Sequence, residues 1–253
     1  MRDLRDVQRV NLQFVRDSTP ISVDGIETLV VLRRDSREVT GCDGTRKPLV
    51  GEMCAVLARE AARRGADYFC LTNADILFSQ DAIALMLTDG REGYAFSRME
   101  VDPTTGADRS IHAGGVDAIA AQPRWWLANR RRFRDFIIGE STWDQIYTSV
   151  LLRHADAVLL NVHPLIRHIE HPVMWSHQGG FADYNGYLGA VDSHYFTLWC
   201  EYHAERERWL RRGGSEDEHF DMQRRVFTRP WPVATKIMQP LKKARAWLRH
   251  ELA

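Results

Sequence analysis

The chain has 253 residues, of which 44% are apolar, so it can bury one substantial core with or without a helical appendage. Its 34 basic and 34 acidic side chains give a formal net charge of zero, which argues against a nucleic-acid-binding protein. The four cysteines are far apart and residues 1–9 are polar. We therefore expect a cytoplasmic protein with reduced thiols and no transmembrane segment.

Apolar runs alternate with segments of helical periodicity in the first half of the chain, which is typical of an α/β fold. The helix at residues 47–64 has the clearest periodicity, and Gly65 is placed to end it. The expected strands are residues 10–15, 26–32, 66–71, 94–98, 115–120 and 157–162, and the other expected helices are residues 80–87 and 143–154.

The character of the chain changes after residue 177, where aromatic and charged residues become frequent. Residues 183–212 and 231–252 are expected to be helical. The sequence therefore predicts an α/β domain at residues 1–182 and a helical C-terminal extension at residues 183–253.

Asn73, Ala74 and Asp75 directly follow the apolar run at residues 66–71. In open α/β sheets the carboxyl ends of the strands form the edge where ligands bind. A carboxylate in such a crevice suits a hard divalent cation, which would stabilise the charge of a departing diphosphate. Taken alone, an aspartate after a strand is more often a helix cap or a turn residue.

Five segments, in this order, resemble a family of bacterial and plant nucleotide-diphospho-sugar transferases of the GT-A superfamily. They are residues 47–62, residues 67–77, residues 114–119, residues 136–139 with 143–144, and residues 168–171 with 176–177. The resemblance implies a Rossmann-like mixed sheet flanked by helices, and a glycosyltransferase that uses a nucleotide-sugar donor and Mn²⁺ or Mg²⁺.

Asn73-Ala74-Asp75 resembles the metal-binding motif of such enzymes, with Asn73 at the position of the first carboxylate. Only Asp75 is then a strong ligand for the metal. Mg²⁺ often relies on substrate phosphates, so a single protein carboxylate is sufficient. Whether the metal binds before the donor or together with its diphosphate stays open.

A second constellation, residues 139–144, contains Glu140 and Asp144. Inverting transfer needs a carboxylate that takes the proton of the acceptor hydroxyl. The resemblance implies Asp144 in this role, and Glu140 is the alternative base. Equally, Ser141 or Thr142 is a candidate cap for the following helix, and Asp144 would then favour its positive end.

A third constellation consists of His168, His171 and His177. The resemblance implies that a late histidine completes the metal shell or meets the diphosphate, and we assign His171 and His177 to the metal. The spacing also resembles half of a zinc site, but no cysteine lies nearby. Ordinary loop histidines are the alternative.

Three further residues are candidates for donor binding. Asp117 follows Gly114 and Gly115, which allow a backbone to approach a ligand closely, and the resemblance implies contact with the sugar or acceptor. Arg46 and Lys47 lie at the start of the long helix and would offer charge to a phosphate. The alternatives are that Asp117 is a turn residue and that Arg46 and Lys47 are solvated surface charges.

Two basic stretches, residues 124–134 and 236–249, contain interleaved aromatic or apolar residues. The first would bind an anionic acceptor or stack on sugar rings. The second would give peripheral contact with the inner face of a membrane. For each, a helix with an apolar core face and a solvated basic face is the alternative.

The sequence thus predicts a metal-dependent, inverting glycosyltransferase that uses a saccharide, lipid-linked or other hydroxyl acceptor. One alternative is a nucleotidyltransferase, although no glycine-rich phosphate loop with a trailing lysine lies near the first strand. The other is a sugar-nucleotide-binding or scaffolding protein on a degenerate transferase fold, which the asparagine at position 73 keeps open.

Overall fold

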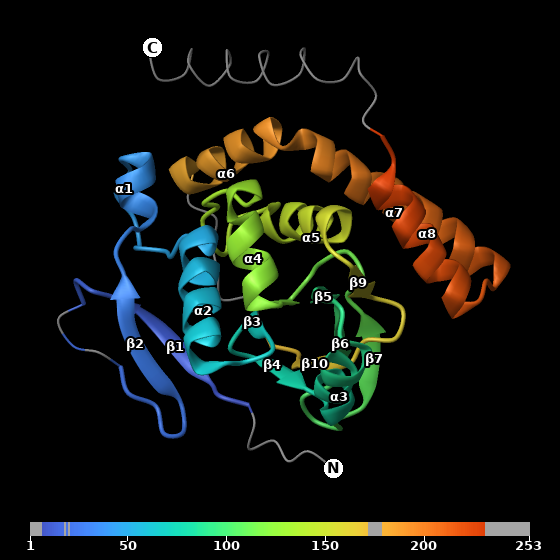
Figure 1. Ribbon diagram of the computed structural model, residues 1–253, viewed down its shortest axis with the longest axis horizontal. Helices are drawn as coiled ribbons and strands as arrows, with labels where there is room; N and C mark the ends of the chain where they lie inside the picture. The colour runs from blue at the N-terminus through green and yellow to red at the C-terminus, as the bar shows by residue number, and fades with distance from the viewer. Residues whose placement is uncertain (1–6, 18, 20, 172–178, 231–253) are drawn as a thin grey trace.

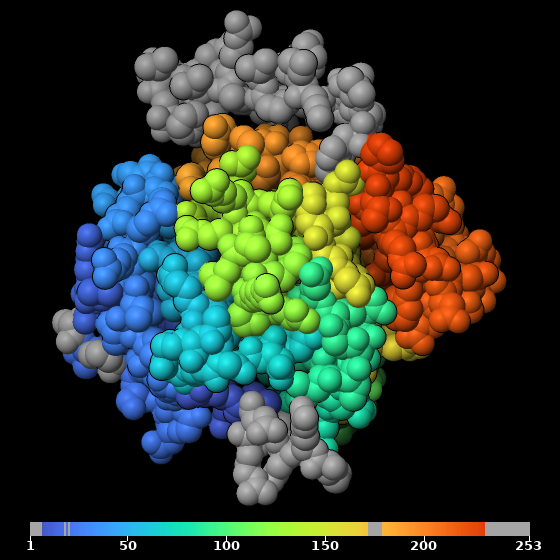
Figure 2. Space-filling model, viewed as in Figure 1, coloured from blue at the N-terminus to red at the C-terminus, as the bar shows by residue number. Residues whose placement is uncertain are grey.

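The computed structural model describes residues 7–17, 19, 21–171 and 179–230. Within these residues the chain is a mixed α/β protein with three small sheets and a helical C-terminal region (Figure 1). The N-terminal strands and the last two helices form opposite flanks of the molecule (Figure 2). The α/β class and the helical C-terminal region are therefore confirmed.

The central sheet has the strand order β3-β8-β5-β9. Strands β3 (Phe69–Thr72), β5 (Gly93–Phe96) and β9 (Ala157–Leu160) run in the same direction, and β8 (Ala118–Ala121) runs against them. Every residue of β5 and β8 is buried, because apolar clusters cover both faces of the sheet. The carboxyl ends of β3, β5 and β9 and the amino end of β8 consequently share one edge.

A second sheet begins at that edge, with the strand order β4-β10-β6-β7. Its strands are β4 (Ile76–Phe78), β6 (Arg98–Val101), β7 (Asp108–Ile111) and β10 (Ile166–Ile169). A third, two-stranded sheet pairs β1 (Val10–Phe14) with β2 (Glu27–Leu32) in parallel.

The expectation of one Rossmann-like mixed sheet is wrong, because the described strands form three sheets. The strand expected at residues 94–98 is broken at Ser97, whose N–H donates to the Leu160 carbonyl and whose hydroxyl donates to the Gly115 carbonyl. After Ser97 the chain leaves the central sheet and enters the second one. Residues 73–75 likewise separate β3 from β4.

Helices cover the central sheet, with α2 (Val50–Arg64), α4 (Pro123–Asn129) and α5 (Trp143–His154) on one face and α3 (Gln80–Asp89) with the second sheet on the other. Helix α2 ends at Gly65, whose φ of 68° is left-handed, as the sequence predicts. It begins at Val50 and not at Lys47, because a residue before proline is pushed towards extended backbone. This part also contains α1 (Ser36–Thr40) and the 3₁₀ turn Arg130–Arg132.

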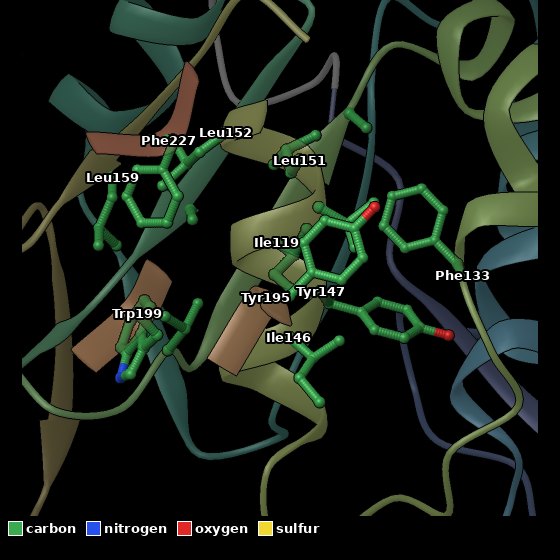
Figure 3. Close-up of a cluster of buried hydrophobic side chains, with 14 of the residues drawn as sticks. Ile119, Phe133, Ile146, Tyr147, Leu151, Leu152, Leu159, Tyr195, Trp199 and Phe227 are labelled. Carbon is green, nitrogen blue, oxygen red and sulfur yellow. The ribbon is translucent and has the colours of Figure 1, made fainter. Parts of the chain in front are cut away.

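The C-terminal region consists of α6 (Gly179–Val191), α7 (Ser193–Arg212) and α8 (Glu216–Thr228). Trp199 of α7 and Phe227 of α8 belong to the same buried cluster as Leu151 of α5 and Leu159 of β9 (Figure 3). The C-terminal helices therefore share one core with the central sheet.

The expected helix at residues 231–252 and its membrane contact through 236–249 lie outside the described residues. Among the residues that are described, no helix combines the length and apolar character needed to cross a bilayer. The four cysteines, Cys42, Cys54, Cys70 and Cys200, are all free thiols.

Candidate metal and donor site

Polar side chains gather at the edge where the central strands end. Asn73 follows β3 directly, and its side-chain amide donates to Oδ1 of Asp117 at 3.4 Å. Asp117 immediately precedes β8, and β8 runs antiparallel to β3. The topology of the sheet thus brings together two residues that the sequence predicts to bind the donor, 44 positions apart.

Three potential metal ligands meet at the same edge. The Oδ2 atom of Asp75 lies 3.0 Å from Nε2 of His171 and 3.3 Å from Nε2 of His168. The two Nε2 atoms are 3.3 Å apart. We call Asp75, His168 and His171 the Asp–His–His cluster. Two of the predicted metal ligands, Asp75 and His171, are therefore in contact, and the third, His177, lies outside the described residues.

Strand pairing explains why the cluster forms. Asp75 precedes β4, and β10 pairs antiparallel with β4 so that His168 lies opposite Ile76. His171 follows the end of β10 by two residues. The alternating pattern of β10 buries Ile166 and His168 on one side, which points the His168 ring towards Asp75.

A second layer of polar contacts fixes His168. Its Nδ1 atom lies 2.6 Å from Oε2 of Glu100, which is opposite His168 in the parallel pair of β6 and β10. Arg98 donates from Nε to Oε1 of Glu100 at 2.7 Å and also pairs with Oδ1 of Asp117. A continuous chain of ionisable side chains therefore connects Asp75 to Asp117.

The electrostatics of the cluster favour an ionised carboxylate. Partial burial alone would raise the pKa of Asp75, but the hydrogen bond from His171 and the charge of His168 hold that pKa below its usual range. Burial likewise opposes ionisation of Glu100, and its bonds to His168 and Arg98 lower its pKa. Both side chains are thus ready acceptors at neutral pH.

Asp117 has an unsatisfied oxygen. The residue is only 8% exposed, and burial raises the pKa of its carboxyl in spite of the opposing charge of Arg98. Its Oδ2 atom is buried and lacks a hydrogen-bond partner among the described residues. A buried oxygen without a partner costs free energy, and such atoms often mark a binding site.

Asp144 lies in the first turn of α5 and accepts a hydrogen bond from the Val116 N–H at 3.3 Å. Loss of solvent raises the pKa of Asp144, and the nearby negative charge of Asp117 raises it further. Thr142 occupies the N-cap position of α5, but its side chain makes no capping hydrogen bond. Its φ of 76° is left-handed, a conformation that costs about 1–2 kcal/mol for a residue with a Cβ atom.

Glu140 is 3% exposed and accepts from Nζ of Lys47 at 2.8 Å. Arg46 lies elsewhere, paired with Asp17 at 2.7 Å and positioned over the ring of Phe14. The two basic residues expected at a phosphate therefore already have protein partners. Their roles, like those of Asp144 and Glu140, stay predictions.

The sequence analysis did not name Arg98 and Glu100 as site residues. A signal was present, because the alternating charges of Arg98-Met99-Glu100 follow the apolar run of β5. Two charges on one face of a strand point to a partner on that face. The partner is His168, which belongs to a strand that the sequence analysis did not predict.

Neither the family models, nor the curated proteins, nor the solved structures include a significant match to this chain.

Proposed function

We propose that the chain is a metal-dependent glycosyltransferase that moves a sugar from a nucleotide-diphosphate donor to a hydroxyl acceptor. The observation that carries the proposal is the Asp–His–His cluster at the carboxyl edge of the central sheet, beside Asn73 and Asp117. This edge is where α/β folds bind their ligands.

The cluster has the donor set and the openness that a cation bridging to a diphosphate requires. Two imidazole nitrogens and one carboxylate oxygen converge, while the Asp75 and His171 side chains remain 41% and 44% exposed. A divalent cation bound there would stabilise the negative charge that develops on the leaving diphosphate. The exposed side of the cluster leaves room for phosphate oxygens.

Asn73, Arg98 and Asp117 would bind the sugar side of the donor. The free Oδ2 atom of Asp117 is an acceptor for a sugar hydroxyl, while Arg98 holds the other carboxylate oxygen in place. A site built to hydrogen-bond a hydroxyl discriminates strongly against an analogue without it, because the buried oxygen then stays unpaired.

Asp144 is the residue that best fits the role of general base. Burial raises the pKa of Asp144, which makes its carboxylate a stronger base, and the residue lies next to the loop that carries Asp117. Glu140 is a weaker candidate, since its carboxylate already accepts from Lys47. Inversion at the anomeric carbon is part of the proposal, because one acceptor-side base suffices for it.

The test is product formation from a panel of nucleotide diphosphate sugars with Mn²⁺ and simple saccharide acceptors, for the wild type and for Asp75→Ala. The proposal expects release of nucleoside diphosphate by the wild type and a loss of at least about 100-fold in the variant. Binding of a nucleotide sugar without turnover would favour a sugar-nucleotide-binding protein. Release of pyrophosphate from a nucleoside triphosphate and a sugar phosphate would favour a nucleotidyltransferase.

A further inference from the structure

We propose that the Asp–His–His cluster is a preassembled centre that binds a borderline divalent cation, such as Mn²⁺, Co²⁺ or Zn²⁺, before any nucleotide arrives and in preference to Mg²⁺. The role of the ion rests on the proposed function. The binding of the ion rests on the ligand geometry alone. The inference concerns the binding order and the identity of the metal, both of which the sequence leaves open.

The three ligand atoms already have the spacing of a metal site. They form a triangle with sides of 3.0, 3.3 and 3.3 Å. An ion bonded at about 2.1 Å to each atom would see them at angles of about 100°, between the octahedral and the tetrahedral values. Little rearrangement is therefore required when the ion enters, and one side of it stays open.

The chemistry of the donor set determines which ion fits. Mg²⁺ takes oxygen ligands and gives up its waters reluctantly, so it rarely binds two imidazoles. Imidazole nitrogens suit the transition-metal ions and zinc, whose affinities for such a site rise from Mn²⁺ through Co²⁺. The presence of both His168 and His171 beside a single carboxylate thus favours these ions over Mg²⁺.

Glu100 is the positioning residue of this centre. Its 2.6 Å contact with Nδ1 of His168 holds the ring with Nε2 facing Asp75, and a proton on Nδ1 donated to Glu100 would leave the Nε2 lone pair for the ion. Arg98 in turn holds the Glu100 carboxylate. Such outer partners are commonly worth about 10- to 100-fold in metal affinity.

The experiment is calorimetric titration of metal-stripped full-length protein with Mn²⁺, Co²⁺ and Mg²⁺ in the absence of any nucleotide. We expect one ion per chain, tighter binding of Co²⁺ than of Mn²⁺, and Mg²⁺ binding that is at least about tenfold weaker than that of Mn²⁺. Visible absorption of the Co²⁺ complex should show bands of a nitrogen-ligated ion.

Substitutions assign the binding to this cluster. His171→Gln should abolish the Co²⁺ bands, and because His171 is half-exposed the variant should keep its melting temperature. His163→Gln, which changes an exposed histidine in the loop between β9 and β10, is the matched control and should bind like the wild type. Glu100→Leu should weaken Co²⁺ binding by about 10- to 100-fold, and Glu100→Gln by less, because an amide oxygen still accepts from Nδ1.

Equal affinity for Mg²⁺ and Co²⁺, or no binding of any ion until a nucleotide is added, would overturn the inference. So would unchanged binding in His171→Gln. These outcomes are separate from failure of the proposed function. If the ion binds as described but no sugar is transferred from any donor, the proposed enzyme activity is contradicted and the metal centre is not.

Discussion

Asp144 and Glu140 are close in sequence but differ in their surroundings. Glu140 is buried against Lys47, whereas Asp144 accepts a backbone N–H from the loop that carries Asp117. We predict that Asp144→Asn lowers turnover by about 10²- to 10⁴-fold, the usual contribution of a positioned base, with donor binding little changed. The measurement is kcat and KM for the donor.

Glu140→Gln is the comparison for that prediction. Loss of the Lys47 ion pair should lower stability, because it leaves a largely buried ammonium group without its charged partner. Turnover of the folded fraction should change by less than about tenfold. If Glu140→Gln loses turnover while Asp144→Asn keeps it, the two roles are reversed.

Asp75 is predicted to act through its charge and not through its size. Asp75→Asn keeps the shape of the side chain but offers a weaker oxygen ligand, so it should bind Mn²⁺ at least about tenfold less tightly than the wild type. Asp43→Asn, which alters an exposed carboxylate between α1 and α2, is the control. Wild-type affinity in Asp75→Asn would remove this residue from the metal site.

The sequence revealed individual site residues better than their partners. Asn73, Asp75 and Asp117 follow or precede apolar runs, so their place at a strand end could be predicted. Arg98 and Glu100 could not, because their role depends on the pairing of β6 with β10. Pairing between strands 68 residues apart is set by tertiary packing, which a local pattern does not contain.

At the scale of elements, β5 and α5 approach each other unusually closely. A Cβ atom on Gly93 would lie 2.6 Å from Cδ1 of Leu151, so we predict that Gly93→Ala destabilises the protein by about 1–3 kcal/mol through overpacking. For a chain of this size that corresponds to a loss of several degrees in melting temperature. Calorimetry or a thermal-shift assay measures it.

Gly186→Ala is the matched control. Gly186 lies in α6, and a Cβ atom there would meet nothing within 4 Å. Alanine is favoured over glycine inside a helix by up to about 1 kcal/mol, so this variant should be slightly more stable than the wild type. Equal effects of the two alanine substitutions would contradict the close packing of β5 on α5.

The long helices and the central strands were predictable because their apolar periodicity is strong. Gly65, for example, marks the C-terminal end of helix α2, and the predicted and observed C-terminal ends agree. The second sheet was not predictable. Its strands β4 and β7 are only three and four residues long, and β7 is mostly exposed, so neither shows the alternation that identifies a strand.

For the whole molecule, a buried polar network links the C-terminal helices to the central sheet. His219 of α8 is 1% exposed and shares a 2.8 Å hydrogen bond with Tyr202 of α7, which donates to Asn161 beyond β9. Gln223 of α8 exchanges two hydrogen bonds with the backbone of Leu159. The helical region is therefore held by polar contacts as well as by the apolar core.

This network makes stability depend on pH. Loss of solvent, with the charge of Arg206, lowers the pKa of His219 to about 4, whereas an unfolded histidine has a pKa of about 6.5. Between these values the unfolded chain binds a proton that the folded chain does not. The free energy of unfolding should therefore fall as the pH falls from about 6.5 to 4, by up to about 3 kcal/mol from this residue.

Urea unfolding at pH 7.5 and pH 5 measures that slope. His219→Gln should lower stability at pH 7.5 and reduce the loss between the two pH values. Replacing the exposed His163 with glutamine, which removes a charge that also lowers the pKa of His219, should change the slope by less than His219→Gln does. An unchanged slope in His219→Gln would show that other groups cause the pH dependence.

The central claim is that the Asp–His–His cluster binds the diphosphate of a nucleotide sugar through a metal ion. A thermal-shift screen of UDP-, GDP-, dTDP- and CMP-sugars, each with and without Mn²⁺, tests it most directly, because a ligand of the folded state raises the melting temperature. We predict that one diphosphate sugar stabilises the wild type only when Mn²⁺ is present, and does not stabilise Asp75→Ala. Equal stabilisation of wild type and Asp75→Ala, or no stabilisation by any diphosphate sugar with Mn²⁺, would contradict the claim.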